Sequence, residues 1–479
     1  MLDWYFVKRA GLGVMLFAAV LVLIVLTPTS ALGGSRTVYV APPNGSNDTA
    51  NLQSALDTCV AYGPKCTVQL AAGTYLTSQL VEYNFQGTFK GMGQRKTTIQ
   101  ALPNLPVPFD LFTQGECKPN TTDCLWPDLI IFVDGNITVS DFTISEPNIP
   151  ATQPWLGGAY TCLNDGIRFM GQNRTNASVQ RVTFKGKPDT SSTSCPDFNF
   201  CNATIFAGEF PKSQTPFDYY FLSGSFSVSN SSFSNVWLGV GADGFRKDSS
   251  VVVGGSPLAA NSFKNVDLGS FVAIAQNSTG EVSYNKSSGN YAAIIIAPWI
   301  PGVFNPSGPS LNFIHDNNLT PTGSCANGVF MQDDPNDPRL YATVYNNTIQ
   351  GQNLCPIDVG YTSGTTIMNN KIVGTGQFAI GMEDDTYAAV LGNDVTGFVA
   401  DSGFAQIMLD GTLLWGTPAD TSYSMVVCKT PSDTVMNLGT NNTMIGCKQV
   451  TNAAGVVSQK AAPRIAVRPE VLKRGPLVP

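Results

Sequence analysis

The sequence is poor in charged residues and nearly lacks histidine. Only 13% of its 479 residues are charged, His315 is the single histidine, and the formal net charge is −7. A protein that binds nucleic acid needs a basic face, so this balance argues against nucleic acid as a partner. Few charges together with 46 glycines instead indicate stacked turns around an aliphatic interior.

Long amphipathic stretches of helical period are also missing from most of the chain, and a repeated phrase takes their place. The phrase is an apolar strand, an Asn, another apolar residue and then a turn residue. Its asparagines are Asn230, Asn261, Asn285, Asn318, Asn347, Asn370 and Asn393, of which the last three are 23 residues apart. A period in this range is typical of repeat architectures.

Each repeat holds short β-rich runs and no crossover helix, which predicts an all-β, right-handed parallel β-helix of about ten to twelve coils. We expect the coils over residues 67–404 and terminal coils or a cap over 405–456. Asn tolerates left-handed backbone geometry and its amide bonds neighbouring backbone. Stacked about 4.8 Å apart, the copies should form a ladder along the coil axis, with Asn347, Asn370 and Asn393 at one corner.

The two ends of the chain differ from the coils. Lys8 and Arg9 precede an apolar run over 11–26, and small residues follow, so 1–32 has the pattern of a secretory signal. An uncleaved membrane anchor is the alternative, and it is the only membrane association that the sequence indicates. Either case predicts a secreted or cell-surface protein. Residues 457–479 lack periodicity, carry basic residues, and are expected to be a disordered tail.

The eleven cysteines all follow the N-terminal segment, and most fall into neighbour pairs. The predicted disulfides are Cys59–Cys66, Cys117–Cys124, Cys325–Cys355 and Cys428–Cys447. Of Cys162, Cys195 and Cys201, one must be left as a free thiol or form an intermolecular disulfide. Metal binding is the rival interpretation, but the sequence has no C-x-x-C pair, and disulfides agree with export. Thirteen N-x-S/T sequons are glycan acceptors in an exported chain, although those beside the repeated Asn are explained as by-products of the repeat.

A helical pattern precedes the coils. Leu52, Ala55, Leu56 and Cys59 have helical spacing, and Asp48 or Thr49 can cap that helix, which would cover the open edge of the first coil within a 33–66 cap. The run from this N-D-x-x-x-x-Q-x-A-x-D helix into V-x-L-x-x-G-T-Y and GMGQRKTTI covers Asn47 to Ile99. It resembles the start of the pectin-lyase-like β-helix superfamily, and the coil phrases extend the resemblance to about Gly397.

The resemblance implies an extracellular polysaccharide as partner but no particular enzyme. The sequence has no G-H-G, the run Gly381-Met-Glu-Asp-Asp is one residue too long for G-x-D-D, and no R-x-P-x-x-R signature occurs in the coils. The expected function is that of a polysaccharide lyase or glycoside hydrolase acting along the flank of the β-helix. The alternative is a non-catalytic surface, adhesion or glycan-binding protein, so enzymatic activity stays open.

Strand alternation predicts which residues face outward in the three most regular coils. Two inward rows are expected, Val329, Ile357, Ile380 and Met331, Val359, Met382. Two outward rows are expected, Phe330, Asp358, Gly381 and Gln332, Gly360, Glu383. Acidic residues follow directly in the turns, so this flank carries the densest group of carboxylates in the sequence.

Clustered carboxylates can act as acid and base or can hold Ca²⁺. The candidate catalytic residues are Asp334, Asp358, Glu383 and Asp384, together with Arg168 as an outward base or carboxylate clamp several coils away. The candidate Ca²⁺ ligands are Asp333, Asp334, Asp384 and Asp385. A plain role as turn residues is the interpretation that the sequence favours for these aspartates. His315, within the strand of a repeat, is expected to be structural.

Overall fold

The structure is a computed structural model, and it describes residues 35–102, 128–145, 165–186, 203–208, 210–211, 219–220, 223–242, 249–272, 278–296, 310–333, 340–410 and 420–450. The chain separates into residues 1–36 and 37–479, and the description below concerns the second unit. The predicted signal segment, the basic tail, the Cys117–Cys124 pair and Asp334 lie outside the described residues. Among the residues that are described, no helix is long and apolar enough to cross a membrane.

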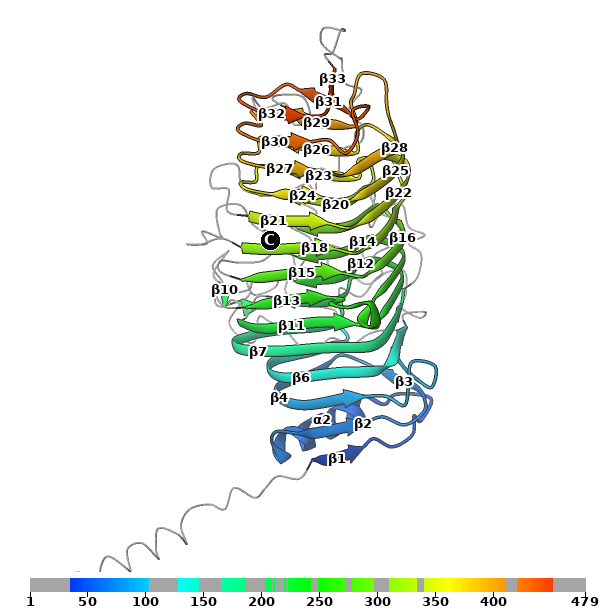
Figure 1. Cartoon of the computed structure of the whole chain (residues 1–479). Helices are drawn as coiled ribbons and strands as arrows, with labels where there is room; N and C mark the ends of the chain where they lie inside the picture. Colours follow the sequence, from blue (N-terminus) through cyan, green and yellow to red (C-terminus); the bar gives the residue numbers. More distant parts are fainter. Residues whose placement is uncertain are drawn as a thin grey trace, which may run out of the picture. The chain divides into compact units, whose positions relative to one another are not determined.

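One helix stands before the coils, as predicted. Helix α2 spans Thr49–Tyr62, and its buried residues are Leu52, Ala55, Leu56 and Cys59. Asp48 occupies the N-cap position, but its carboxylate accepts hydrogen bonds from the backbone N–H groups of Asn44 and Leu76 and none from the helix. The helix packs on β2 and β4 in the first coils (Figure 1). Its cap residue therefore fastens the helix to a strand.

The strands wind in parallel from one coil to the next, and Figure 1 shows them one above another. The N-terminal strands are β1 Arg36–Tyr39, β2 Cys66–Gln69, β3 Gly73–Thr77, β4 Leu80–Lys90, β5 Thr97–Ala101, β6 Ile130–Ser145 and β7 Asp165–Lys185. The middle strands are β8 Ala203–Gly208, β11 Ser223–Ser229, β12 Ser232–Ala242, β13 Ser250–Val253, β14 Ser262–Val272 and β15 Thr279–Ser283. A short 3₁₀ turn, Pro257–Ala259, and an antiparallel pair, β9 Phe210–Pro211 with β10 Tyr219–Tyr220, interrupt this series.

Beyond β15 each coil consists of three strands, which form three walls. The first wall holds β17 Ala292–Ile296, β20 Asn327–Gln332, β23 Ile357–Gly360, β26 Ile380–Glu383 and β29 Ile407–Asp410. The second holds β18 Ser310–His315, β21 Leu340–Tyr345, β24 Thr366–Met368, β27 Ala389–Leu391 and β30 Met425–Val427. The third holds β16 Lys286–Asn290, β19 Asn318–Pro321, β22 Thr348–Leu354, β25 Lys371–Gly376 and β28 Asp394–Ala400. Parallel pairing then continues through β31 Thr434–Asn437, β32 Thr443–Ile445 and β33 Lys448–Gln449.

This pairing is the predicted all-β right-handed parallel β-helix, and the predicted rows are confirmed. Val329 aligns with Ile357 and Ile380, and their side chains are buried in the aliphatic core together with Met331, Val359 and Met382. Farther toward the N-terminus the core is aromatic, with Phe184, Phe233 and Phe263 stacked on three successive coils at centroid distances of 5.2 and 4.8 Å. Alternation along each strand thus fixes which residues fill the interior.

An asparagine ladder joins the second and third walls. The Nδ2 group of each member donates to the Oδ1 of the next through Asn261, Asn285, Asn317, Asn347, Asn370 and Asn393, over 2.9–3.1 Å. The ladder amides are buried, and each also donates to a backbone carbonyl, as Asn370 does to Val344. The predicted corner of Asn347, Asn370 and Asn393 is confirmed.

Two members of the predicted series were placed one residue off. Asn317 and not Asn318 is the ladder residue, and the position before Asn261 is filled by Ser231 and not by Asn230. The ladder amide stands two residues before an inward apolar side chain, and Leu319 therefore selects Asn317. The left-handed geometry belongs to the residue just before the ladder amide, as at Asn346 and Asn369, both with φ of 55°.

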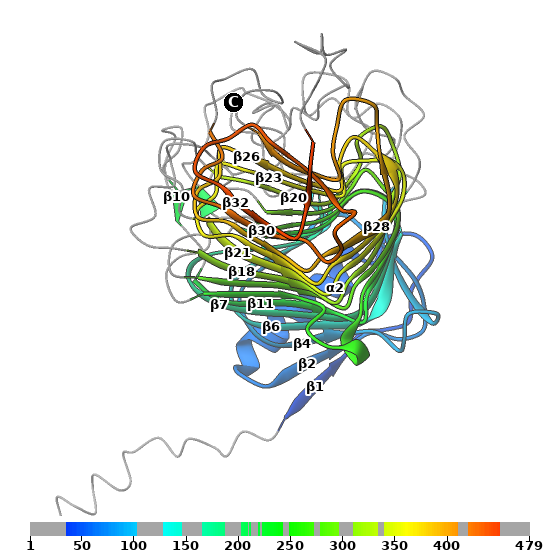
Figure 2. The same ribbon diagram turned by 45° about the horizontal axis from the view of Figure 1, so that its top comes forward.

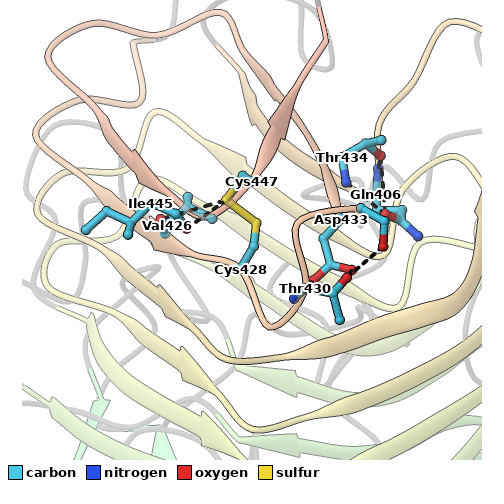
Figure 3. Close-up of a disulfide and its surroundings, with 9 residues drawn as sticks. Gln406, Val426, Cys428, Thr430, Asp433, Thr434, Ile445 and Cys447 are labelled. Atoms are coloured by element: carbon cyan, nitrogen blue, oxygen red, sulfur yellow. Dashed lines mark hydrogen bonds between the residues drawn. A yellow bond between two sulfur atoms is a disulfide. The ribbon is translucent and has the colours of Figure 1, made fainter.

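Three predicted disulfides are present. Cys59–Cys66 joins the helix to β2, Cys325–Cys355 joins neighbouring coils, and Cys428–Cys447 joins the last coils, with Cα–Cα distances of 5.4, 4.7 and 5.2 Å. Figure 3 shows the last of these beside Gln406. The Gln406 amide donates to the carbonyl of Phe398 and accepts from the N–H of Thr434, so the terminal coils are tied by side chains as well as by sulfur.

Candidate functional site

The outward face of the first wall carries two of the predicted acids on neighbouring coils. Asp358 in β23 aligns with Phe330 before it and Gly381 after it, and Glu383 in β26 aligns with Gly360. With strands about 4.8 Å apart and a rise of about 3.3 Å per residue, the Cα atoms of Asp358 and Glu383 are separated by roughly 8 Å. Both predicted outward rows are therefore confirmed, and together they form a pair of acids on one face.

Asp358 lies in apolar surroundings. Phe330 next to it is 7% exposed, and a Cβ atom at Gly381 would lie 2.6 Å from the ring of Phe378, so that ring covers the outward face of Gly381. Burial raises the pKa of Asp358 from its usual 3.8 to about 7. A carboxyl group with this pKa holds its proton at neutral pH for an appreciable fraction of the time and can donate it.

Glu383 and the residue that aligns with it continue the acidic row. The Glu383 side chain is 2% exposed, and its backbone pairs in register with Asp410 of β29. Sequence reasoning missed Asp410, although the alternation of Ile407 and Leu409 inward carries the pattern on to it. Extending the row of Gly360 and Glu383 by one coil would have identified Asp410. The row Gly360, Glu383 and Asp410 thus places acidic residues on two successive coils.

The other predicted acids lie in the turns that follow the first wall. Asp333 accepts a hydrogen bond from the N–H of Leu340, and Asp384, at φ of 54°, accepts one from the N–H of Asp420 at 3.1 Å. Asp385 is fully buried and accepts from both the N–H and the hydroxyl of Thr362, at 2.7 and 2.6 Å. These contacts close and join turns, which is the role that the sequence favoured for aspartates here.

The environment of Asp385 also disfavours its charged form. Burial raises the pKa of Asp385 well above its ordinary value, the two hydrogen bonds from Thr362 oppose this, and the nearby charge of Asp358 adds to the increase. A protonated carboxyl is a poor ligand for Ca²⁺. The described residues contain no group of three His, Cys, Asp or Glu side chains placed to hold a metal. Asp334 is outside them, so the Ca²⁺ site stays a prediction.

Arg168 shares the outward row of Asp358 but not its site. The row runs in register from Ile131 through Arg168 and Phe206, and six strand pairings separate Arg168 from Asp358, or roughly 29 Å. Its side chain is 1% exposed, and its Nε donates to the buried carboxylate of Asp128 at 2.7 Å. The guanidinium is therefore not presented outward as predicted, because a buried ion pair holds it.

The single histidine lies on the outward face of the second wall. His315 Nδ1 is 2.8 Å from Asp316, its Nε2 is 3.4 Å from Glu281, and its ring stacks on Tyr345 at 4.6 Å. Carboxylates thus flank both ring nitrogens, and the ring of Tyr284 meets it edge-on at 5.7 Å. These contacts fix the ring, in keeping with the structural role expected from the sequence.

No protein-family model matches the chain, and no curated protein matches it in sequence. Among solved structures, it is similar to the A-module of the mannuronan C-5 epimerase AlgE6 of Azotobacter vinelandii, with 14% identity, 88% of this chain and 98% of that one covered, and a TM-score of 0.49. It is also similar to a hyperthermoactive exopolygalacturonase from Thermotoga maritima, with 10% identity, coverages of 87% and 92%, and a TM-score of 0.42.

The Dettilon tailspike protein is a third similar structure, with 11% identity, coverages of 85% and 68%, and a TM-score of 0.47. At these identities and scores the similarity concerns the fold, and we take no activity or substrate from it. The fold itself, a parallel β-helix, follows from the pairing of the chain's own strands.

Proposed function

We propose that the chain hydrolyses a polysaccharide on the outward face of its first wall, with Asp358 and Glu383 as the two carboxyl groups. The observation that carries the proposal is their placement on adjacent coils of one face, with the pKa of Asp358 raised to about 7 by burial. Glycoside hydrolysis requires a pair of carboxyl groups, one of which donates a proton. The backbone separation of roughly 8 Å suits such a pair.

In this proposal Asp358 donates its proton to the glycosidic oxygen as the bond to the leaving sugar breaks. Glu383, as a carboxylate, either takes a proton from the attacking water or attacks the sugar itself, depending on the distance between the two carboxyl groups in the complex. In the first case water supplies the hydroxyl group of the product, and the proton on Glu383 then returns to Asp358 through solvent. In the second case the ester between Glu383 and the sugar is hydrolysed by water, and Asp358 takes the proton of that water and regains its starting form. Phe330 and Phe378 keep the surroundings of Asp358 apolar and so keep its pKa raised.

Elimination by a lyase is the other chemistry predicted for this flank. A lyase breaks the same bond without water and leaves an unsaturated sugar, and a divalent cation can assist by stabilising the uronate carboxyl group. The Ca²⁺ predicted for Asp333, Asp334, Asp384 and Asp385 belongs to this version of the proposal. Adding Ca²⁺ or a chelator in the assay separates the two chemistries.

We further propose that the protein works outside the cytoplasm. Three disulfides support this, because disulfides persist in oxidising compartments. The second candidate function is non-catalytic glycan binding by a secreted or surface protein. The observation that favours it is the burial of Glu383, which is 2% exposed and leaves little surface for a substrate to reach.

The test is incubation of the full chain with a panel of neutral and uronate-containing polysaccharides, with and without Ca²⁺. New reducing ends are expected, and Asp358→Asn or Glu383→Gln should lower kcat by about 100-fold or more. The matched control is Asp394→Asn, which removes an acid that pairs with Lys429 at 3.0 Å on another wall. Unsaturated products would favour the lyase, and binding without turnover, or full activity in Asp358→Asn, would reject the hydrolase.

A further inference from the structure

Two exposed tyrosines stack on each other just beyond the candidate acids. Tyr387 is 66% exposed and Tyr423 is 57% exposed, and their rings lie 5.5 Å apart with an angle of 19° between the ring planes. They occupy turns on successive coils, joined by the bridge between Thr386 and Ser422. Tyr387 follows Glu383 by only four residues, so the ring pair begins in the turn that leaves the proposed active face.

These tyrosines stand where the backbone disfavours them. Tyr387 has φ of 56° and Tyr423 has φ of 54°, whereas the equivalent position on the preceding coil is Gly364, with φ of 72°. The left-handed region is unfavourable for a residue with a large side chain, whereas glycine adopts it freely. The stacking of the two rings offsets part of this unfavourable free energy. Stability therefore does not explain why two successive coils carry an exposed Tyr where the coil before has Gly.

The ring of Tyr341 lies over Gly364, where the next two coils have Tyr387 and Tyr423. A Cβ atom at Gly364 would lie 3.2 Å from the ring of Tyr341, which is 39% exposed on β21. Tyr341, Tyr387 and Tyr423 thus cover a strip that follows the coil axis. We call these three residues the tyrosine strip. Exposed apolar surface arranged in this way marks a binding site.

Two carboxylates beside the strip indicate which class of ligand it can bind. Asp384 and Asp420 lie in the same turns, with the Asp420 N–H donating to the Asp384 carboxylate, and the exposed Asp420 carboxylate accepts from Thr440. Carboxylates next to the rings repel a uronate. The face of a neutral sugar ring carries C–H groups that pack on an aromatic face, and its hydroxyl edge can reach these carboxylates.

We infer that the tyrosine strip binds a neutral polysaccharide, which lies along the coil axis against the exposed parts of successive tyrosines. The inference rests on the proposed function for the assumption that the ligand is a polysaccharide. It adds that the polysaccharide is neutral and that it binds at the turns between the first and second walls. The repeat of the rings is that of the coils, about 4.8 Å. A linear polymer with one sugar per coil repeat fits this spacing.

The test is binding of the full chain to neutral and uronate-containing polysaccharides by calorimetry, with Tyr387→Asn and Tyr423→Asn singly and together. Asn accepts the left-handed backbone, so these variants should keep the melting temperature of the wild type. The control is Tyr39→Ala, which removes an equally exposed Tyr, 78% exposed, from β1. Each strip variant should weaken neutral-glycan binding by about tenfold, which corresponds to about 1.4 kcal/mol, with KM affected and kcat retained.

The outcomes separate this inference from the proposed hydrolysis. Weaker binding in the strip variants, in a protein that shows no turnover with any polysaccharide, supports the strip and rejects the hydrolase. Loss of turnover in Asp358→Asn supports the hydrolase. An unchanged KM in the Tyr387→Asn, Tyr423→Asn double variant rejects the strip. Preference for uronate-containing chains over neutral ones rejects the assignment of the ligand.

Discussion

Two corners of the coil flank the second wall and follow opposite rules. The ladder corner, Asn261 to Asn393, repeats one buried amide with the same contacts on each coil. The acid corner, residues 361–365, 384–388 and 420–424, changes its residues from coil to coil, so that Thr362, Asp385 and Thr421 share one position. Figure 2 shows the first wall, β20, β23 and β26, and the third-wall strand β28. The invariant corner serves the stability of the stack, and the variable corner is where single coils acquire individual side chains.

The largest effect is expected from breaking the ladder. Asn370→Ala removes the acceptor of the Asn347 N–H and Nδ2 and the donor to the Val344 carbonyl, all of them buried. Asn347 Nδ2 keeps its bonds to the carbonyls of Ile314 and Tyr345, so two buried groups, the Asn347 N–H and the Val344 carbonyl, lose this partner. At about 1–3 kcal/mol for each, the free energy of unfolding should fall by about 2–6 kcal/mol. Denaturant unfolding measures this, with Asn346→Gly, the exposed left-handed neighbour, as control. Equal stability of the two variants would contradict the ladder's role.

A slightly smaller effect is expected at the corner between the third and first walls. Cys325 and Cys355 close a loop of 30 residues, and replacing both with Ser should lower the free energy of unfolding by about 3 kcal/mol. Non-reducing peptide mapping should find this bridge together with Cys428–Cys447. Free thiols at both pairs in exported protein would contradict the structure and the proposed location.

The acid corner and its neighbouring wall should make stability depend on pH. The folded state raises the pKa of Asp358 to about 7 by burial and that of Asp385 well above its usual value, so it binds protons more tightly than the unfolded state. Their contribution is present below the unfolded pKa of about 4 and is lost as the pH rises toward 7. The free energy of unfolding, and with it the melting temperature, should therefore fall between pH 5 and 8. Asp358→Asn should reduce the fall in free energy by on the order of 2 kcal/mol, a value that is discounted because solvent reaches part of Asp358.

A residual slope should remain in that variant, since burial also raises the pKa of Glu82 to about 7. The control is Asp394→Asn. Hydrogen bonds from Thr396 and Lys429 lower the pKa of Asp394, so its contribution is present above the unfolded pKa and is lost only as the pH falls below about 4. If the melting temperature of the wild type instead rises from pH 5 to 8, burial does not raise the pKa values of these acids as described.

The smallest effect is expected where the acid corner carries its tyrosines. Tyr387→Gly relieves the left-handed backbone at φ of 56° but loses the stacking contact with Tyr423, so the free energy of unfolding should change by less than about 1 kcal/mol. Thermal unfolding measures this. A loss as large as that of Asn370→Ala would mean that the ring pair supports the fold, and the comparison between the two corners would fail.

Sequence reasoning succeeded where a residue's role is set by its neighbours along the chain. The period of the repeat and strand alternation predicted that Ile357 and Ile380 point inward and Asp358 outward, and helical spacing predicted the buried face of α2. It failed by one residue at Asn317, where two adjacent asparagines both fit the phrase. It also treated Asp358, Asp384 and Asp385 as one patch, although the first lies on a strand face and the others fasten turns.

The coil, its inward rows, the amide corner and the pairing of neighbouring cysteines could be predicted from the sequence, because each depends on a pattern that repeats within about one coil. Which outward residues are buried depends on contacts that form only in the folded stack. The ring of Phe378 covers Gly381, and Asp128 comes from another coil to pair with Arg168. Ionisation follows burial, and burial depends on segments that the repeat brings together from other coils. The proton that Asp358 holds near neutral pH is therefore a property of the folded stack.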